Sequence, residues 1–463
     1  MTALISPPSA ACAAPPIVRS IITWALESVD YGQESYPRSV VEALPPVLQD
    51  AVRRLPSLIE ETLARSGVPG LAVAVVHDGT TVYTAGFGVK TVGATDLIGP
   101  ETVFLLTTLP EPPEPPEPPE PAEPAEPAGA TASAGLTVTA AKTCPPVIGW
   151  DPRSLSELPS FAVSGRGLTS RDTEHETVGG ACSHPTWLRK AAGDLLKDLG
   201  TNRGALLSHL RYEPLDPFRI GSEYAGFGLA AGAEAAAAAA GTDSVTLSQW
   251  APHQPSGMAS TSSRYRDYLG RADRATSHAF VDGRFQPRDE RTAEDQTFAG
   301  AVSSNVEDLA RWMALVLGHG VVGPAQHIKA TDRLTATSGP VVSSRAGDGA
   351  TGEGTYGYGF SLGTQAGGPA TPHRSGGFTC GAAVMLIPSA DVGIVVLTNG
   401  APVGAAEAVA TTFADIVAFG SPTRDWCSLF SKALASTLVT EGGPVPSKAL
   451  EDFDENGLHT WNR

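Results

Sequence analysis

The most regular chemical pattern in the sequence is a run in which glutamates recur at every third position between prolines. A period of three is that of a polyproline II helix, so the carboxylates would align along one edge of a rod that rises ~3.1 Å per residue. This run cannot enter a core, because proline lacks a backbone donor and unpaired carboxylates are costly to bury. The pattern predicts a low-complexity acidic insertion over residues 110–136, which carries Glu111, Glu114, Glu117, Glu120, Glu123 and Glu126.

The cysteines and histidines give no pattern for a metal site or a disulfide framework. The cysteines are widely scattered, with no C-x-x-C pair and no histidine at metal-ligand spacing. We therefore expect no metal and no cofactor. The cysteines are Cys12, Cys144, Cys182, Cys380 and Cys427.

The composition is that of a globular protein. Of 463 residues, 41% are hydrophobic and 17% charged, which is enough for a large core in one or two domains. The net charge of -17 disfavours nucleic acid and anionic membranes as partners and favours neutral or cationic ligands. No window reaches the ~18 consecutive apolar residues of a membrane span, and no signal peptide is readable at the N-terminus. We expect a soluble protein, with its compartment and oligomeric state left open.

The elements that would position a site are readable at both ends of the chain. Apolar residues at three- and four-residue steps predict a helix over 48–63 that ends at Gly67, with Pro56 as a possible break. Two apolar runs, Leu71–Val76 and Thr81–Phe87, flank an Asp-Gly dipeptide and predict a hairpin. This end of the chain therefore supplies a helix and two strands.

The C-terminal part of the chain also reads as two strands and a helix. Strands are expected at Ala382–Ile387 and Gly393–Leu397, and a helix at Ala405–Val417, with Asn399 and Gly400 in a turn after the last strand. We infer one antiparallel sheet built from both ends of the chain, in an α/β (α+β) sandwich flanked by helices, with the middle inserted as a helical subdomain. The expected segments are a poorly ordered start (1–43), the first part of the α/β domain (44–109), the insertion (110–136), a mostly helical and loop subdomain (137–335), the second part of the α/β domain (336–426) and a C-terminal tail (427–463).

Two helices are expected in the middle segment, at Ser222–Ala240 and Ser304–Leu317. For the second, Ser303 or Ser304 offers an N-cap, and a glutamate three residues after Ser304 fits a capping box. Asp308 and Arg311 lie on one face of this helix, and we expect them to be solvated or to bridge two parts of the fold rather than to act in catalysis.

Several segments together resemble the serine β-lactamase and penicillin-binding family of class C type, which includes esterase and D-aminopeptidase relatives. They follow the family's order and extend from about Glu60 to Trp426. The segments are "SGVPGLAVAVVHDGTTVYTAGFGV", "GPETVFLL", "TEHETVGGACSH", "DPFRIGSEYAGFGLAAG", "QPSGMASTSSRY", "FAGAVSSNVEDLARWM", "YGYGFSLG" and "HRSGGFTCGAAVMLIPSADVGIVVLTNG". The resemblance implies a β-lactamase/transpeptidase-like fold, a small acyl substrate (β-lactam, ester or D-amino-acid peptide), and acyl transfer to a serine followed by hydrolysis.

The resemblance also implies a nucleophilic serine and, three positions later, a lysine that helps to deprotonate it. No serine stands three positions before any lysine of this chain. In the family's register Thr108 takes the serine's place and Glu111 the lysine's place. The nearest substitute pair is Thr139 and Lys142, just past the insertion, although a threonine in an ordinary loop is the simpler interpretation.

The resemblance implies two further walls of the site. Ser222 and Tyr224 fall where the family has the tyrosine and asparagine of its Tyr-x-Asn element; either can line the site, or Ser222 can cap a helix while Tyr224 packs. The run His373, Arg374, Ser375 and Gly376 resembles the family's His-Ser-Gly strand, with Arg374 where histidine is expected. An arginine there can bind a substrate carboxylate.

Two interpretations of the insertion remain open, and with them two functions. The Pro/Glu run is either a real acidic spacer, or a repeat expansion or wrongly joined gene model that has replaced the nucleophile helix. The chain is accordingly either a β-lactamase-related serine hydrolase or a catalytically dead relative, a pseudoenzyme that binds ligands.

Overall fold

The computed structural model describes separate segments of the chain. They are residues 44–106, 226–239, 242–281, 283–288, 302–322, 325–326, 341–344, 354–356, 361–365, 368–376, 380–401 and 403–440.

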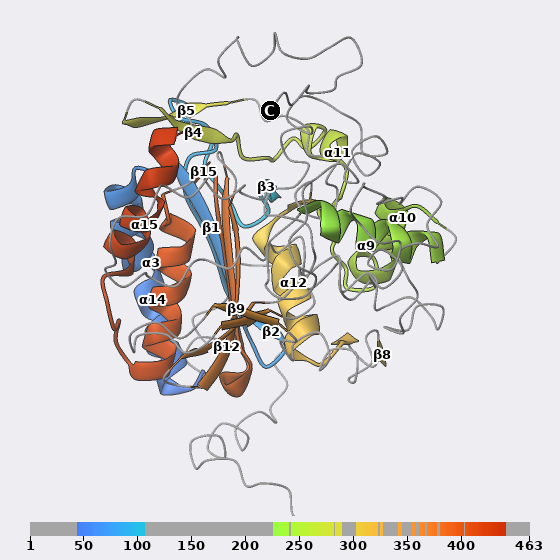
Figure 1. The fold of residues 1–463 in the computed structure, drawn as a ribbon. Helices are drawn as coiled ribbons and strands as arrows, with labels where there is room; N and C mark the ends of the chain where they lie inside the picture. The colour runs from blue at the N-terminus through green and yellow to red at the C-terminus, as the bar shows by residue number, and fades with distance from the viewer. Residues whose placement is uncertain are drawn as a thin grey trace, which may run out of the picture.

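An eight-stranded antiparallel sheet forms the centre of the fold (Figure 1). Its N-terminal hairpin pairs with the C-terminal strands: Leu71 lies opposite Thr398 and His77 opposite Val392. The predicted sheet built from both ends of the chain and the α+β fold class are therefore confirmed. In spatial order the strands are β2 (Thr80–Gly88), β1 (Gly70–His77), β14 (Val392–Thr398), β13 (Gly381–Ile387), β12 (Gly368–Gly376), β11 (Ser361–Gln365), β10 (Gly354–Tyr356) and β9 (Val341–Ser344).

Helices cover both faces of the sheet (Figure 1). Successive side chains of β1 point to opposite faces, because a strand alternates with a period of two. Ala72, Ala74 and Val76 face a core shared with α12 (Val306–Leu317), whereas Leu71, Val73 and Val75 face a core shared with α3 (Pro46–Ser66) and α14 (Ala405–Phe419). Burial on both faces explains why β1, β13 and β14 read as unbroken apolar runs rather than as alternating ones.

The helix α3 is continuous through Pro56, so the expected break is absent. A proline inside a helix removes one hydrogen bond and costs about 3 kcal/mol. Val52, Leu55 and Ile59 are buried on either side of it, against the sheet. Tertiary packing of this face is the reason that the helix persists.

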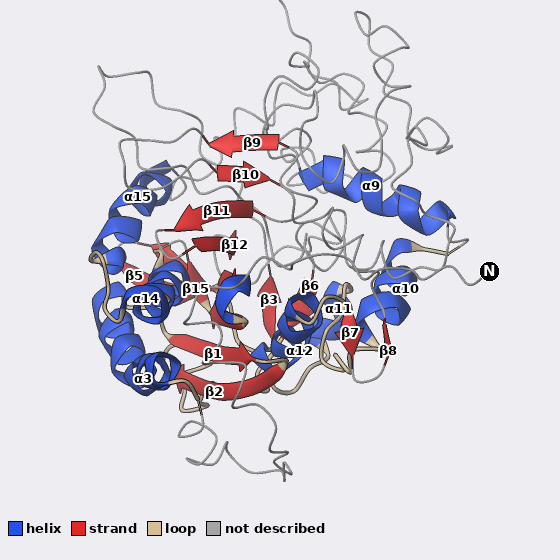
Figure 2. Cartoon of the chain, turned by 90° about the horizontal axis from the view of Figure 1, so that it is seen from below, coloured by secondary structure: helices blue, strands red, loops and turns tan. Residues whose placement is uncertain are grey.

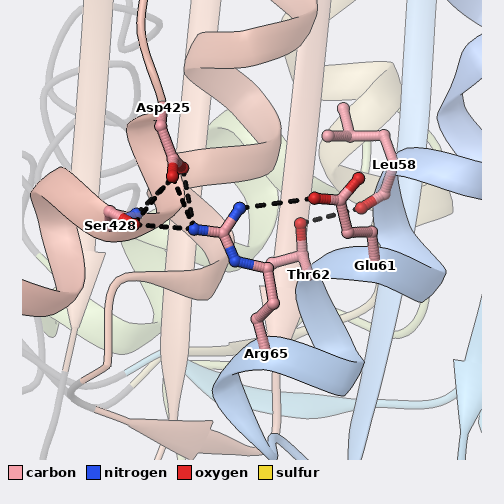
Figure 3. Close-up of polar contacts among 6 residues, drawn as sticks. All are labelled: Leu58, Glu61, Thr62, Arg65, Asp425 and Ser428. Carbon is pink, nitrogen blue, oxygen red and sulfur yellow. Dashed lines mark hydrogen bonds and ion pairs between the residues drawn. The ribbon is translucent and has the colours of Figure 1, made fainter.

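The C-terminal helix α15 (Trp426–Thr440) packs against α14 and α3. Gly404, which precedes α14, has a φ of 74°, and a Cβ there would lie 2.4 Å from the Cβ of Phe430. Arg65 of α3 donates to both carboxylate oxygens of Asp425, at 2.9 and 2.7 Å, and to the hydroxyl of Ser428 (Figure 3). These contacts fix the start of α15 on the outer helical layer.

Most of the remaining elements lie on the α12 side of the sheet (Figure 2), and β4 and β5 lie across one end of it (Figure 1). The hairpin of β4 and β5 joins β15 in a three-stranded sheet. The elements are β3 (Phe104–Leu106), α9 (Gly226–Ala239), α10 (Ser244–Ser248), the π-helix Gln249–His253, α11 (Tyr265–Leu269), β4 (His278–Val281), β5 (Arg284–Pro287), β6 (Val302–Ser304), β7 (Val321–Val322), β8 (Ala325–Gln326) and β15 (Gly400–Ala401).

The expected serine cap of α12 is wrong. Ser303 and Ser304 belong to β6, and the N-cap is Asn305, whose side-chain oxygen accepts from the backbone N–H of Asp308 at 2.8 Å. Ser303 and Ser304 are part of a strand that pairs with β3, so they do not cap the helix. The local sequence does not reveal this distant partner.

Candidate functional site

The third predicted wall, residues 373–376, lies on β12, beside β13. In the backbone register Arg374 is opposite Ala383, Ser375 opposite Ala382 and Gly376 opposite Gly381. The structure thus places the segment of His373, Arg374, Ser375 and Gly376 at the end of a strand in the main sheet.

The other predicted site residues lie outside the described residues. They are Thr108, Glu111, Thr139, Lys142, Ser222 and Tyr224. The structure therefore locates the elements that lead to them: β3 ends two residues before Thr108, and α9 begins two residues after Tyr224.

The buried strand β3 is the last described element before Thr108 in the sequence. It pairs with β6, with Leu105 opposite Ser303 and Leu106 opposite Val302. Phe104 and Leu106 belong to the same core cluster as Ala382 of β13, the register partner of Ser375. The end of β3 and the strand pair β12–β13 therefore pack against the same hydrophobic core.

Asp308 connects α12 to the loop before α11. One oxygen of its buried carboxylate accepts from the backbone N–H of Ser260 at 2.7 Å and from the hydroxyl of Thr261 at 2.9 Å. Its other oxygen accepts from Arg311 at 2.6 Å. The pair of Asp308 and Arg311 bridges two parts of the fold, which was one of the two expected roles.

A second set of polar contacts holds the turn that precedes β3. The hydroxyl of Thr102 accepts from the backbone N–H of Gly99 at 2.9 Å and donates to Asp273 at 2.8 Å. Lys90 pairs with the same oxygen of Asp273, also at 2.8 Å. These contacts hold the turn that precedes β3 against the segment between α11 and β4.

Asn399 is a buried junction that sequence reasoning missed, since we assigned it to an ordinary turn. Its side-chain amide donates to the carbonyls of Val89 and Lys90, at 3.0 and 2.9 Å, and its backbone N–H donates to Gly70. Its carbonyl accepts from the backbone N–H of His278 at 2.9 Å. The residue after it begins β15, so this position joins two sheets.

The buried imidazole of His278 completes this junction. Its Nδ1 lies 2.9 Å from the Asn399 carbonyl, and its Nε2 accepts from the backbone N–H of Val92 at 3.0 Å. These two partners require a proton on Nδ1 and a neutral ring. Burial lowers the pKa of His278, although its backbone hydrogen bonds oppose this shift. His278 therefore acts as a neutral structural link.

Within the described residues, no group of three or more His, Cys, Asp or Glu side chains is arranged to hold a metal ion. Neither Cys380 nor Cys427 is joined in a disulfide, and the Cys380 sulfur lies 3.1 Å from the hydroxyl of Ser277. None of the described helices is long and apolar enough to cross a membrane.

The chain belongs to the β-lactamase family. The family model described as "Beta-lactamase" matches residues 55–107 and 170–419, which is more than half of the chain. No curated protein matches the sequence.

Solved structures share the fold at low sequence identity. The octameric penicillin-binding protein homologue from Pyrococcus abyssi is 17% identical, with a TM-score of 0.60, over 84% of this chain and 77% of that one. A class C β-lactamase from Rhodobacter sphaeroides is 18% identical, with a TM-score of 0.58, over 79% of this chain and 98% of that one. A class C β-lactamase in complex with cefoxitin is 15% identical, with a TM-score of 0.60, over 80% of this chain and 99% of that one.

The family match is interrupted at the place where the sequence lacks its nucleophile. It stops at Thr107, the residue before Thr108, and resumes at Ser170. The unmatched interval contains the Pro/Glu run, Thr139 and Lys142. The flanks of the site therefore follow the family, and the interval between them does not.

Proposed function

We propose that this chain binds small acyl compounds of the kind that the β-lactamase family processes, and that it does not hydrolyse them through a serine acyl-enzyme. The observation that carries this proposal is the absence of any Ser-x-x-Lys, together with a family match that breaks at Thr107. A hydroxyl without a nearby base is a weak nucleophile, so the acylation step loses its activated group. Binding does not depend on that group.

The retained part of the site supports ligand binding. β12 carries the Arg-Ser-Gly run at its end, where its residues Thr371–Gly376 pair with β13. Arginine recognises a carboxylate through two parallel hydrogen bonds, and substrates of this family commonly carry one. A β-lactam, a D-amino-acid peptide or an ester with a free carboxylate fits this recognition.

A second candidate function is hydrolysis by an altered nucleophile, and it is favoured by the pair Thr139 and Lys142. In this alternative the Thr139 hydroxyl gives its proton to Lys142 and attacks the carbonyl, and water then releases the acyl group. Thr108 is the other hydroxyl in the family's register, with Ser222 or Tyr224 as the second polar group.

Three probes separate these functions: a chromogenic cephalosporin, a p-nitrophenyl ester and a fluorophosphonate, each followed by the intact mass of the protein. We expect saturable binding of the cephalosporin, no turnover and no covalent adduct. Turnover with an adduct at Thr139, lost in Thr139→Ala and kept in the neighbouring control Thr137→Ala, would establish the altered nucleophile and refute the proposal.

A second measurement decides whether the chain as written is the one that is made. Sequencing the transcript across Glu101–Cys144 is expected to return the Pro/Glu run. A Ser-x-x-Lys in that interval would replace the binding proposal with serine hydrolysis.

A further inference from the structure

A groove next to α11 has a positive lining in a strongly acidic protein. Its volume is about 520 Å³, and three arginines line it, Arg264, Arg266 and Arg271, together with a single carboxylate, Asp267. The whole chain carries a net charge of -17. An excess of guanidinium groups around one hollow attracts anions locally, whatever the sign of the distant surface.

The carboxylates near this groove are already engaged. Asp267 accepts from the hydroxyl of Ser262 at 2.6 Å, and its other oxygen lies 4.0 Å from Nε of Arg266. Asp243, whose charge is felt by Arg264, caps α10 and accepts from the backbone N–H and the hydroxyl of Thr246, at 2.9 and 2.6 Å. Neither carboxylate is placed to neutralise all three arginines.

The wall that carries the arginines is held in place. Arg271 donates to the carbonyl of Ala259 at 3.0 Å, across the groove's own lining. Ser262 pairs with Ser303 of β6 through two backbone hydrogen bonds, at 3.0 and 2.8 Å, and Thr261 donates to the buried Asp308. Because the wall is fixed before a ligand arrives, less ordering opposes binding.

We propose that this groove binds an anion with two or more carboxylate or phosphate groups. Guanidinium groups recognise both kinds of oxyanion with paired N–H donors, and three of them suit a multivalent ligand better than a single charge. None of the residues that line the groove belongs to β12, so this proposal does not rest on the function proposed for that strand.

Titration calorimetry of the full-length protein tests this proposal, with citrate and inorganic pyrophosphate as the probes. We expect saturable binding at one site that weakens as sodium chloride is added. Arg264→Gln and Arg266→Gln should each weaken binding by about tenfold or more, since each removes a charge-assisted contact. The control Arg53→Gln makes the same charge change on the exposed side of α3 and should leave affinity unchanged. Triethyl citrate, which has no charge, should give no heat.

The chain's own Glu111–Glu126 run is a second source of carboxylates, and a further arm distinguishes it. If citrate binds more tightly after all six glutamates are changed to glutamine, the run competes for the groove. If the affinity is unchanged, the ligand comes from outside the chain. Equal citrate affinity in the wild type, Arg264→Gln and Arg266→Gln, with all three folded by their unfolding midpoints, would overturn the proposal, as would the absence of saturable binding.

Discussion

At the residue scale, Asn399 connects the main sheet, the segment after β2 and the three-stranded sheet, although its place after a strand suggests an ordinary turn. Replacing it with alanine removes a fully buried side chain and its two hydrogen bonds to the part-buried carbonyls of Val89 and Lys90, of which only the Lys90 carbonyl keeps a second donor, the backbone N–H of Thr276. We expect Asn399→Ala to lower the free energy of unfolding by about 2 to 4 kcal/mol. Asn399→Asp, which has the same shape, should cost more at neutral pH, because it sets a carboxylate against two carbonyl oxygens.

Urea denaturation measures both changes. Thr95→Ala, in the exposed turn between β2 and β3, serves as the control and should shift the midpoint very little. If Asn399→Asp were as stable as the wild type, the amide would not be the donor to these carbonyls.

His253 gives the protein a pH dependence of known sign. It is buried, its Nδ1 has no hydrogen-bond partner among the described residues, and burial lowers its pKa to about 4. The unfolded chain therefore binds a proton at higher pH than the folded chain does. Stability is full above the unfolded pKa of ~6.5 and is lost as the pH falls toward about 4, by up to about 3 kcal/mol.

The difference between the wild type and His253→Gln isolates this contribution. Unfolding free energies at pH 7.5, 6, 5 and 4.5 should fall more steeply for the wild type than for the variant, because glutamine does not titrate in this range. Parallel curves would show that His253 does not gain a proton on unfolding.

At the element scale, the link between α3 and α15 is an exposed one. The Arg65 guanidinium and the Ser428 contacts hold the pKa of Asp425 well below its usual range. Exposed ion pairs contribute little to global stability. We therefore expect Asp425→Asn to increase amide hydrogen exchange in α15 while the global unfolding midpoint stays nearly constant.

A matched control lies in the same helical layer. Asp50 pairs with Arg54 at 2.7 Å within α3, so Asp50→Asn removes a similar exposed ion pair that does not reach α15. Exchange in α15 should be unchanged in that variant. Equal exchange in the wild type and Asp425→Asn would mean that Phe430 and its apolar neighbours hold the helix without Arg65.

Elements whose pattern is local were predictable from the sequence. The hairpin and the two C-terminal strands follow from apolar runs around tight turns, and the structure extends them by only one or two residues. Features set by distant partners were not predictable. Pro56 is tolerated because its helix is buried against the sheet, and Asn305 caps α12 because the serines before it pair with β3.

In the candidate site, too, local features were predictable and features set by distant partners were not. The run from His373 to Gly376 could be assigned to a strand because it resembles the family's His-Ser-Gly strand, and the structure supplies its register with β13. The junction at Asn399 could not be predicted, because its partners are 309 and 310 positions away in the sequence. The predictions for Thr108, Thr139, Lys142, Ser222 and Tyr224 remain predictions.

At the scale of the whole molecule, the sheet is completed only by the last strands of the chain. β1 pairs with β2 along one edge and with β14 along the other. The residues of β14 lie more than 300 positions after those of β1 in the sequence. A chain that ends at Thr379 lacks β13 and β14, and we expect it to show no cooperative unfolding by circular dichroism. A chain that ends at Gly420 keeps every strand of the eight-stranded sheet and, among the described elements, loses α15, so it should still unfold cooperatively at a lower midpoint.

This closure has a consequence for biosynthesis. While the ribosome is still adding the middle of the protein, the apolar edge of β1 has no strand to pair with, and non-local pairing of this kind is slow and prone to aggregation. The nascent polypeptide must keep that edge protected until Thr398 has left the exit tunnel, which makes the N-terminal hairpin the segment that a chaperone would guard longest.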